Sequence, residues 1–174
     1  MTASTTQEAA ETAGESDPVN VARILVLRRL DSAPRTRAEL EGYLSQRGVP
    51  DDAAAEVLDR FEDVGLIDDV AYAEGWVRSR HGTKGLGRRA VAAELRRKGV
   101  SDDIVAAALE PIDPAQERER AMALARSRYP QVMGLPYATQ VRRLMGALTR
   151  RGYEISLASE VVRQVVAEES VGVE

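Results

Sequence analysis

The stretch AVAAELRRKGVSDDIVAAAL, residues 90–109, decides the fold of this chain. Val91 and Leu95 lie one helical turn apart and mark the buried face of a helix. Cationic residues and then Gly99 follow, as is typical of a helix end, where glycine adopts the left-handed conformation and positive charge suits the helix dipole. Asp102 opens the next segment with an acidic first turn. The stretch therefore predicts two helices joined by a tight turn.

The same pattern occurs twice more, as AELEGYLSQRGVPDDAAAEVL at 38–58 and RRLMGALTRRGYEISLASEVV at 142–162. The three turn glycines, Gly48, Gly99 and Gly152, are 51 and 53 residues apart. Apolar positions align with them, in the sets Leu40, Val91 and Leu144; Leu44, Leu95 and Leu148; Ala53, Ile104 and Leu157; Val57, Ala108 and Val161; Leu58, Leu109 and Val162. A repeat of this period has room for three helices.

Helical periodicity at 19–31, 69–80 and 114–128 supplies the first helix of each repeat. Aromatic residues are only 4% of the chain, and no run alternates with a period of two, so a β-rich core is not expected. We expect an all-α protein of three tandem three-helix repeats that stack into an elongated, curved body.

Composition shifts set the expected domain limits. A disordered acidic leader at 1–17 precedes the repeats, which span 18–67, 68–112 and 113–168, and a tail follows at 169–174. The chain has no Cys, which excludes disulfides and thiolate metal sites. It shows neither a signal peptide nor an apolar run of transmembrane length, so a cytoplasmic protein without membrane association is expected.

The net charge of −4 hides two basic blocks. Residues 75–100 hold eight cations against Glu94 alone, and residues 118–152 hold eight against Glu119 alone. All but two of the chain's 24 cations are Arg, whose planar fork suits phosphate and carboxylate. The blocks predict an anionic partner, while single Arg residues are equally explained as solvated surface.

The segment HGTKGLGRR, residues 81–89, invites comparison with a phosphate-binding loop. A Walker A loop needs Gly-Lys-Ser/Thr between a strand and a helix, and neither the order nor the context fits. His81 is the only histidine and is expected to be a loop residue, which leaves no triad chemistry. The segment is interpreted as a joint between two helices, whose glycines let the chain turn and whose cations extend a basic face.

Paired acids at Asp51-Asp52, Asp68-Asp69 and Asp102-Asp103 could serve as metal ligands, but their positions at helix starts explain them better. Tyr72 and Trp76, four residues apart, are interpreted as core rather than as a stacking platform. No catalytic residue, metal or cofactor is expected.

The Arg faces are the better candidates for binding. Arg89 and Arg96 lie opposite the buried Val91–Leu95 face, and Arg143 and Arg150, seven apart, share an outer face. Such faces suit a phosphate backbone or an acidic protein groove. The candidate contacts are Arg78, Arg80, Lys84, Arg88, Arg89, Arg96, Arg97, Arg142, Arg143, Arg150 and Arg151.

The middle repeat resembles the RecX family of regulatory proteins, through VGLIDDVAYAEGWVRSR at 64–80, a glycine joint and then residues 90–109. RTRAELEGYLSQRG at 35–48 and LDRFEDVGLID at 58–68 fit the family's first repeat, and the third repeat matches mainly at RRGY. The positions that carry the resemblance are Gly65, Leu66, Ile67, Asp68, Asp69, Tyr72, Ala73, Arg78, Arg80, Gly87, Glu94, Leu95, Lys98 and Gly99.

The resemblance implies tandem three-helix repeats and a non-enzymatic protein, expected to be a monomer, that binds the RecA nucleoprotein filament in its groove. It implies inhibition of RecA's ATPase, recombinase and coprotease activities, hence a role in DNA repair, recombination and the SOS response, with single- or double-stranded DNA as a second partner. On this hypothesis, charge reversal at Arg89 and Arg96 weakens inhibition of ATP hydrolysis. The alternatives are a stand-alone DNA- or RNA-binding repeat protein and a nuclease that uses the Asp pairs.

Overall fold

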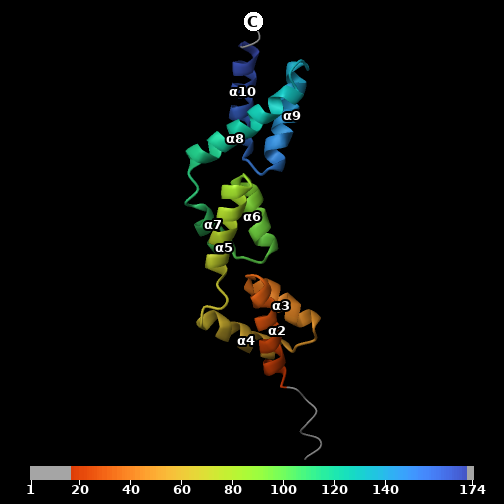
Figure 1. The fold of residues 1–174 in the computed structure, drawn as a ribbon, viewed down its shortest axis with the longest axis vertical. Coiled ribbons are helices and arrows are strands. Elements are labelled where there is room, and N and C mark those ends of the chain that lie inside the picture. The colour runs from red at the N-terminus through yellow and green to blue at the C-terminus, as the bar shows by residue number, and fades with distance from the viewer. Residues whose placement is uncertain (1–16, 172–174) are drawn as a thin grey trace, which may run out of the picture. The chain divides into compact units, whose positions relative to one another are not determined.

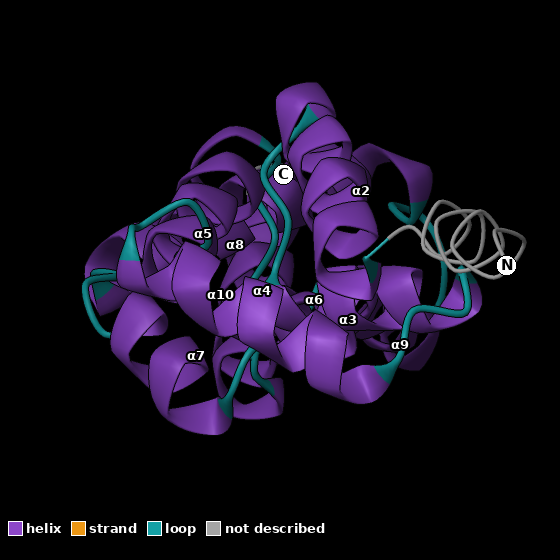
Figure 2. Cartoon of the chain, turned by 90° about the horizontal axis from the view of Figure 1, so that it is seen from below, coloured by secondary structure: helices purple, strands orange, loops and turns teal. Residues whose placement is uncertain are grey.

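The computed structural model describes residues 17–171, and every regular element in that range is a helix (Figure 2). The all-α prediction is confirmed, and nine α-helices, α2 to α10, form three successive groups of three within the described part. The predicted leader at 1–17 and the end of the predicted tail lie almost wholly outside the described residues. The curvature predicted for the repeats stays a prediction.

The first repeat consists of α2 (Pro18–Ser32), α3 (Arg37–Gln46) and α4 (Asp51–Asp63), which contact one another (Figure 1). Local sequence sets where these helices begin. The Asp17 side chain accepts from the amide of Val19, and Thr36 forms a capping box with Glu39. Apolar faces of all three helices enclose one core.

The middle repeat consists of α5 (Asp69–Val77), a π-helical turn at Arg78–Thr83, α6 (Arg88–Arg97) and α7 (Asp102–Leu109). The predicted helix at 69–80 therefore changes type after Val77. In the wider turn the amide of Lys84 donates to the carbonyl of Ser79, five residues back.

The third repeat consists of α8 (Pro114–Arg128), a short 3-10 turn at Tyr129–Gln131, α9 (Tyr137–Arg150) and α10 (Ile155–Val171). The predicted helix at 114–128 has the observed bounds. Helix α10 packs against both α8 and α9, and the core between them is rich in Val and Ala, as the low aromatic content requires (Figure 1).

The three predicted turns have one geometry. Gly48, Gly99 and Gly152 have φ of 73°, 79° and 83°, in the left-handed region. The residue after each glycine donates its amide to the carbonyl of the leucine five positions earlier, in the pairs Val49–Leu44, Val100–Leu95 and Tyr153–Leu148, each at 3.2 Å. This is the Schellman arrangement, which satisfies carbonyls that the helix end leaves open.

The aligned leucine and valine positions before these turns form the centre of the repeats. Leu40, Leu44, Val91, Leu95, Leu144 and Leu148 are at most 1% exposed. In the following helices, Ile104, Leu109 and Leu157 are only half-buried, whereas their counterparts are buried. The sequence repeat therefore corresponds to a structural repeat.

The chain divides into two compact units, Met1–Tyr72 and Ala73–Glu174. The first unit contains α2 to α4, and the second contains α6 to α10, with the division falling inside α5. The middle and third repeats thus belong to one unit. The repeat limits at 67/68 and 112/113 stay predictions.

Candidate functional site

The segment 81–89, interpreted above as a joint between two helices, is packed against the third repeat. The amide of Gly87 donates to the carbonyl of Arg151 at 2.8 Å, and the amide of Arg89 donates to the carbonyl of Gly152 at 3.1 Å. A Cβ atom on Gly87 would meet the carbonyl of Gly152 and lie 2.6 Å from the amide nitrogen of Tyr153. The absence of a side chain at Gly87 therefore allows the two backbones to come into close contact.

An ion pair reinforces this contact between the middle and third repeats. The Glu117 side chain, 8% exposed, lies 3.3 Å from Nε of Arg88 and also accepts from the Arg88 amide at 3.0 Å. A second guanidinium nitrogen of Arg88 donates to the carbonyl of Ile112. Arg88 is thus held by groups of its own unit.

His81 lies in the π-helical turn and is buried, so its interpretation as a loop residue is wrong. Its Nδ1 lies 2.8 Å from the carbonyl oxygen of Leu86, and its own carbonyl accepts from Arg120. Arg151 donates to the carbonyl of Lys84 at 2.8 Å in the same way. The carbonyls of this segment face cations of the third repeat, so the segment does not present a set of amides to a phosphate.

The Tyr153 hydroxyl donates to the carbonyl of Gly85 at 3.1 Å and completes the contact. Burial, with a smaller contribution from the Glu117 carboxylate, raises the pKa of Tyr153 above its usual value. The contact between the two repeats therefore consists of backbone and side-chain hydrogen bonds, the ion pairs Arg88–Glu117 and Arg89–Glu154, and two glycines.

Most predicted binding residues of the middle repeat face carboxylates. Arg96 lies 2.6 Å from Asp102, a carboxylate of the next helix. Further pairs are Arg78–Glu74 at 3.8 Å, Arg80–Glu94 at 3.0 Å and Arg89–Glu154 at 3.5 Å. Lys84 and Arg97 are exposed and have no such pair within residues 17–171. The block that looked uniformly basic in sequence is largely compensated in the structure.

Trp76 is half-buried, so it is only partly enclosed and is not one of the fully buried core residues. The guanidinium of Arg80 lies 4.2 Å from the centroid of its ring, and the ammonium of Lys98 lies 4.6 Å away. Its indole Nε1 donates to Glu94 at 2.8 Å. The helix α5–α6 contact is therefore made by stacked cations and an aromatic ring at the surface.

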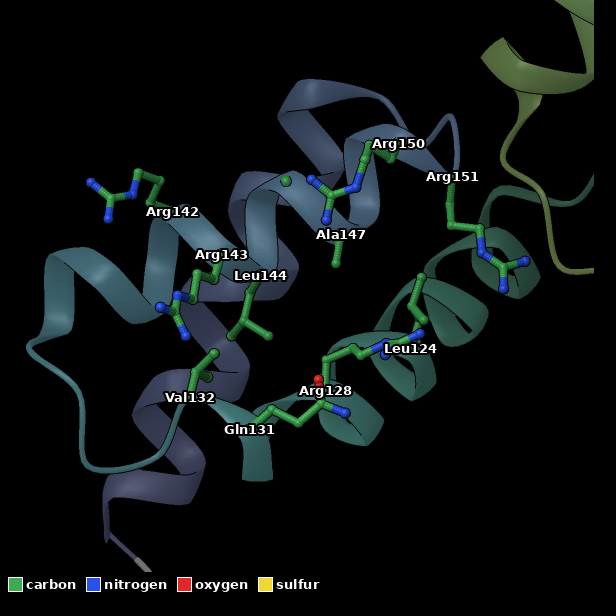
Figure 3. Close-up of a pocket in the computed structure, with 11 residues that line it drawn as sticks. Leu124, Arg128, Gln131, Val132, Arg142, Arg143, Leu144, Ala147, Arg150 and Arg151 are labelled. Carbon is green, nitrogen blue, oxygen red and sulfur yellow. The ribbon is translucent and has the colours of Figure 1, made fainter.

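The third repeat offers a groove of about 550 Å³ between the carboxyl end of α8 and helix α9 (Figure 3). Its apolar walls come from Leu124 and Val132 on one side and from Leu144 and Ala147 on the other. Five guanidinium groups line it, those of Arg128, Arg142, Arg143, Arg150 and Arg151. None of the described lining residues is acidic.

The groove guanidiniums differ from those of the middle repeat in having no carboxylate partner. Within the described range, no ion pair or hydrogen bond involves the side chains of Arg128, Arg142, Arg143 and Arg150. The side chain of Arg151 donates only to the Lys84 carbonyl. Four of these five residues were predicted from the face of α9. Arg128 was missed, although it closes the last turn of a predicted helix inside the basic block.

Gly146 shapes the position of Arg150. A Cβ atom on Gly146 would lie 3.1 Å from Nη1 of Arg150, so the guanidinium lies along the helix over the space that a side chain would fill. Figure 3 shows Arg143 and Arg150 rising from the same helix, with the Arg142 head directed away from them. The sequence placed Arg143 and Arg150 on one face, but the role of Gly146 follows only from the structure.

The acidic pairs sit at helix starts, as predicted. Asp51-Asp52 and Asp102-Asp103 occupy the first turns of α4 and α7, and Asp68 accepts from the amide of Ala71 at 2.8 Å. In the part of the chain that the structure describes, no group of three His, Asp or Glu side chains is placed to hold a metal ion. No described helix has the length and apolar character to cross a membrane.

Family models match both of the first two repeats. The model described as RecX, first three-helix domain, matches residues 22–61, and the model of the second three-helix domain matches residues 68–109. Both matched ranges fall on helices α2 to α7.

Curated relatives cover most of the chain. A regulatory protein RecX of Thermobifida fusca (strain YX) is 50% identical over 153 residues, which are 88% of this chain and 83% of the relative. A regulatory protein RecX of Mycolicibacterium smegmatis is 51% identical over 152 residues, or 85% of this chain and 81% of the relative.

Solved structures share the fold. The crystal structure of RecX from Lactobacillus salivarius has a TM-score of 0.79 at 23% identity, and the alignment covers 87% of this chain and 98% of the other. Together with the identity to curated relatives over most of their length, the turn geometry and the helix order lead to one conclusion: this chain belongs to the RecX family of regulatory proteins.

Proposed function

We propose that this chain regulates the RecA recombinase by binding the RecA nucleoprotein filament in its helical groove. On this proposal it inhibits the ATPase, recombinase and coprotease activities of RecA, and so modulates DNA repair, recombination and the SOS response. Membership in a family of regulatory proteins supports a non-catalytic role. The protein works in the cytoplasm, as a monomer, with RecA as its partner.

The Arg-lined groove of the third repeat is the observation that carries the proposal. A filament of protein on nucleic acid presents carboxylates and phosphates, and unpaired guanidinium groups bind both. The groove guanidiniums are available because no described carboxylate neutralises them. Cations that already face a carboxylate have less to gain from a new anion.

The contact between Gly87 and Gly152 joins the repeat that contains the groove to the middle repeat. It ties the middle repeat to the third through backbone hydrogen bonds, so both repeats present their surfaces to a partner as one unit. Binding of a partner that spans both repeats then costs the protein little conformational entropy, which favours affinity.

The test is inhibition of DNA-dependent ATP hydrolysis by RecA. The R143E/R150E variant reverses two charges of the groove and is expected to need at least about tenfold more protein for half-inhibition, because it replaces attraction by repulsion at the contact. The matched control is R89E/R96E, which makes the same charge change where each Arg faces a carboxylate. Its expected loss is only about two- to threefold.

Circular dichroism on both variants checks that the helical fold is kept. A folded R143E/R150E protein that inhibits as well as the parent would show that the groove does not contact the RecA filament. A larger loss in R89E/R96E than in R143E/R150E would move the contact to the middle repeat, where sequence reasoning also placed candidates.

The same groove also suits a stand-alone nucleic-acid binder, since phosphates pair with Arg forks. A salt titration of DNA binding without RecA separates the two functions. Tight binding that weakens steeply with salt supports the stand-alone function, whereas negligible binding supports the protein filament as the required partner.

A further inference from the structure

We propose that the groove between α8 and α9 is a docking site for an acidic polypeptide segment of a partner protein. The inference deepens the proposed function, and it rests on that function only for the statement that the segment belongs to the regulated filament. Its two supports are the charge of the groove rim and the apolar nature of its walls.

The charge argument starts from five guanidinium groups in one groove without an acid among the described lining residues. Like charges that line one groove repel one another, and salt at physiological concentration weakens this repulsion. An anionic ligand relieves that repulsion and gains charge-assisted hydrogen bonds. The groove therefore selects an anion that carries several charges.

The apolar walls of the groove indicate that the ligand also carries apolar groups. Leu124 and Ala147 are half-buried and still expose apolar surface to the groove, between the guanidinium groups. A phosphate backbone that touched the rim would leave this surface wet. A peptide covers it with its own apolar side chains while its carboxylates reach the rim, as in helix-in-groove and acidic-motif recognition.

Apart from its guanidiniums, the described lining of the groove contains little that recognises a nucleotide base. Its described lining has no aromatic ring for stacking, and Gln131 is the only lining side chain with a neutral amide. The volume of about 550 Å³ is in the range of pockets that take a few side chains. These features favour a polypeptide over a nucleic acid.

The spacing of the rim residues sets the spacing of the carboxylates. Arg143 and Arg150 are seven residues apart on α9, a rise of about 10 Å along the helix axis. Glutamates at positions i and i+7 of a helical segment span the same distance on one face of that helix.

The experiment measures binding of a fluorescein-labelled peptide of about 15 residues to the full chain by anisotropy. The peptide has Glu at i, i+3, i+4 and i+7 among Leu and Ala, and its matched control has Gln at the same positions. We expect the Glu peptide to bind at least about tenfold more tightly than the Gln peptide, and the R143Q/R150Q variant to lose this preference. The R89Q/R96Q variant keeps it.

A single-stranded oligothymidylate of similar length is the second probe. If it binds through Arg143 and Arg150 while the Glu peptide does not, the groove is a phosphate site and the inference is wrong. Equal binding of the Glu and Gln peptides, or Glu-peptide binding that R143Q/R150Q leaves unchanged, overturns it as well.

Inhibition of RecA by the same R143Q/R150Q protein keeps this inference separate from the proposed function. Lost inhibition without any groove-dependent peptide binding leaves the proposed function standing and removes the acidic segment. Groove-dependent peptide binding with unchanged inhibition supports the docking site and removes the groove from the regulation of RecA.

Discussion

The basic blocks of the middle and third repeats look alike in sequence and differ in the structure. Each has eight cations and a single acid. In the middle repeat, Arg80, Arg88 and Arg96 lie beside carboxylates. In the third repeat, Arg118 and Arg126 also pair with carboxylates, but Arg143 and Arg150 have no such partner in the described range and line a groove. Charge counted along a chain therefore does not measure the charge that a surface offers to a ligand.

The difference arises from the acids outside each block. Asp102 belongs to the next helix, and Glu117 and Glu154 belong to the third repeat, yet they face Arg96, Arg88 and Arg89 respectively. The basic residues of the middle repeat thus hold two helices and two repeats together. Among the groove cations of the described range, Arg151 is used in this way, through the Lys84 carbonyl, whereas Arg143 and Arg150 are not.

The pair Arg88–Glu117 provides the strongest test of the difference between paired and unpaired cations. The R88A variant leaves the carboxylate of Glu117 buried without its partner and is expected to lower the free energy of unfolding by about 3 kcal/mol. The R143A variant removes an unpaired, exposed Arg and is expected to change it by at most about 0.5 kcal/mol. Urea unfolding followed through Trp76, the only tryptophan of the chain and part of the same unit, measures both.

Equal effects of the two Arg substitutions on unfolding would contradict the distinction between paired and unpaired cations. A double variant, R88M/E117L, refines the test. Because it removes both charges and keeps similar volume, it is expected to recover much of the stability that R88A loses.

Gly87 tests the backbone contact between the two repeats. A methyl group there meets the backbone of Gly152 and Tyr153, so G87A is expected to cost about 2 kcal/mol and to loosen the third repeat from the middle one. G82A is the control in the same segment, since a Cβ on Gly82 meets nothing within 4 Å. Limited proteolysis together with the Trp76 transition gives the readout; a G87A protein as resistant as G82A would argue against a tight contact.

The smallest expected effect concerns repulsion within the groove. The R143Q/R150Q variant removes two like charges and is expected to raise stability by up to about 0.5 kcal/mol at low ionic strength. The gain should vanish in 1 M salt, where the screening length falls to about 3 Å. Thermal unfolding at the two salt concentrations measures it, and a loss of stability at low salt would show that these guanidiniums have partners.

Sequence reasoning performed best where one residue type meets one local requirement. Gly48, Gly99 and Gly152 marked three helix ends because the left-handed conformation favours glycine, and the structure has the same turn at each. The burial of Leu44, Leu95 and other aligned positions followed from helical periodicity. Recognition of the family followed from the order and spacing of the motifs at 64–80 and 90–109.

Sequence reasoning failed at residues whose surroundings come from distant parts of the chain. His81 was placed in a loop, but carbonyl and guanidinium partners of the same unit enclose it. Trp76 was placed in the core, but it is only partly enclosed, and Arg80 and Lys98 stack on its ring. Arg128 was missed as a groove residue because its neighbours on α9 are not near it in sequence.

The sequence by itself determined the helices, the three glycine turns and the core positions, because these depend on spacing within one helix or across one turn. Only the tertiary structure decided that HGTKGLGRR is a packed contact and that the free guanidiniums gather between α8 and α9. The physical reason is that an ion pair forms between side chains that folding brings together, such as Arg88 and Glu117. No local pattern of charges specifies which Arg remains available to a partner.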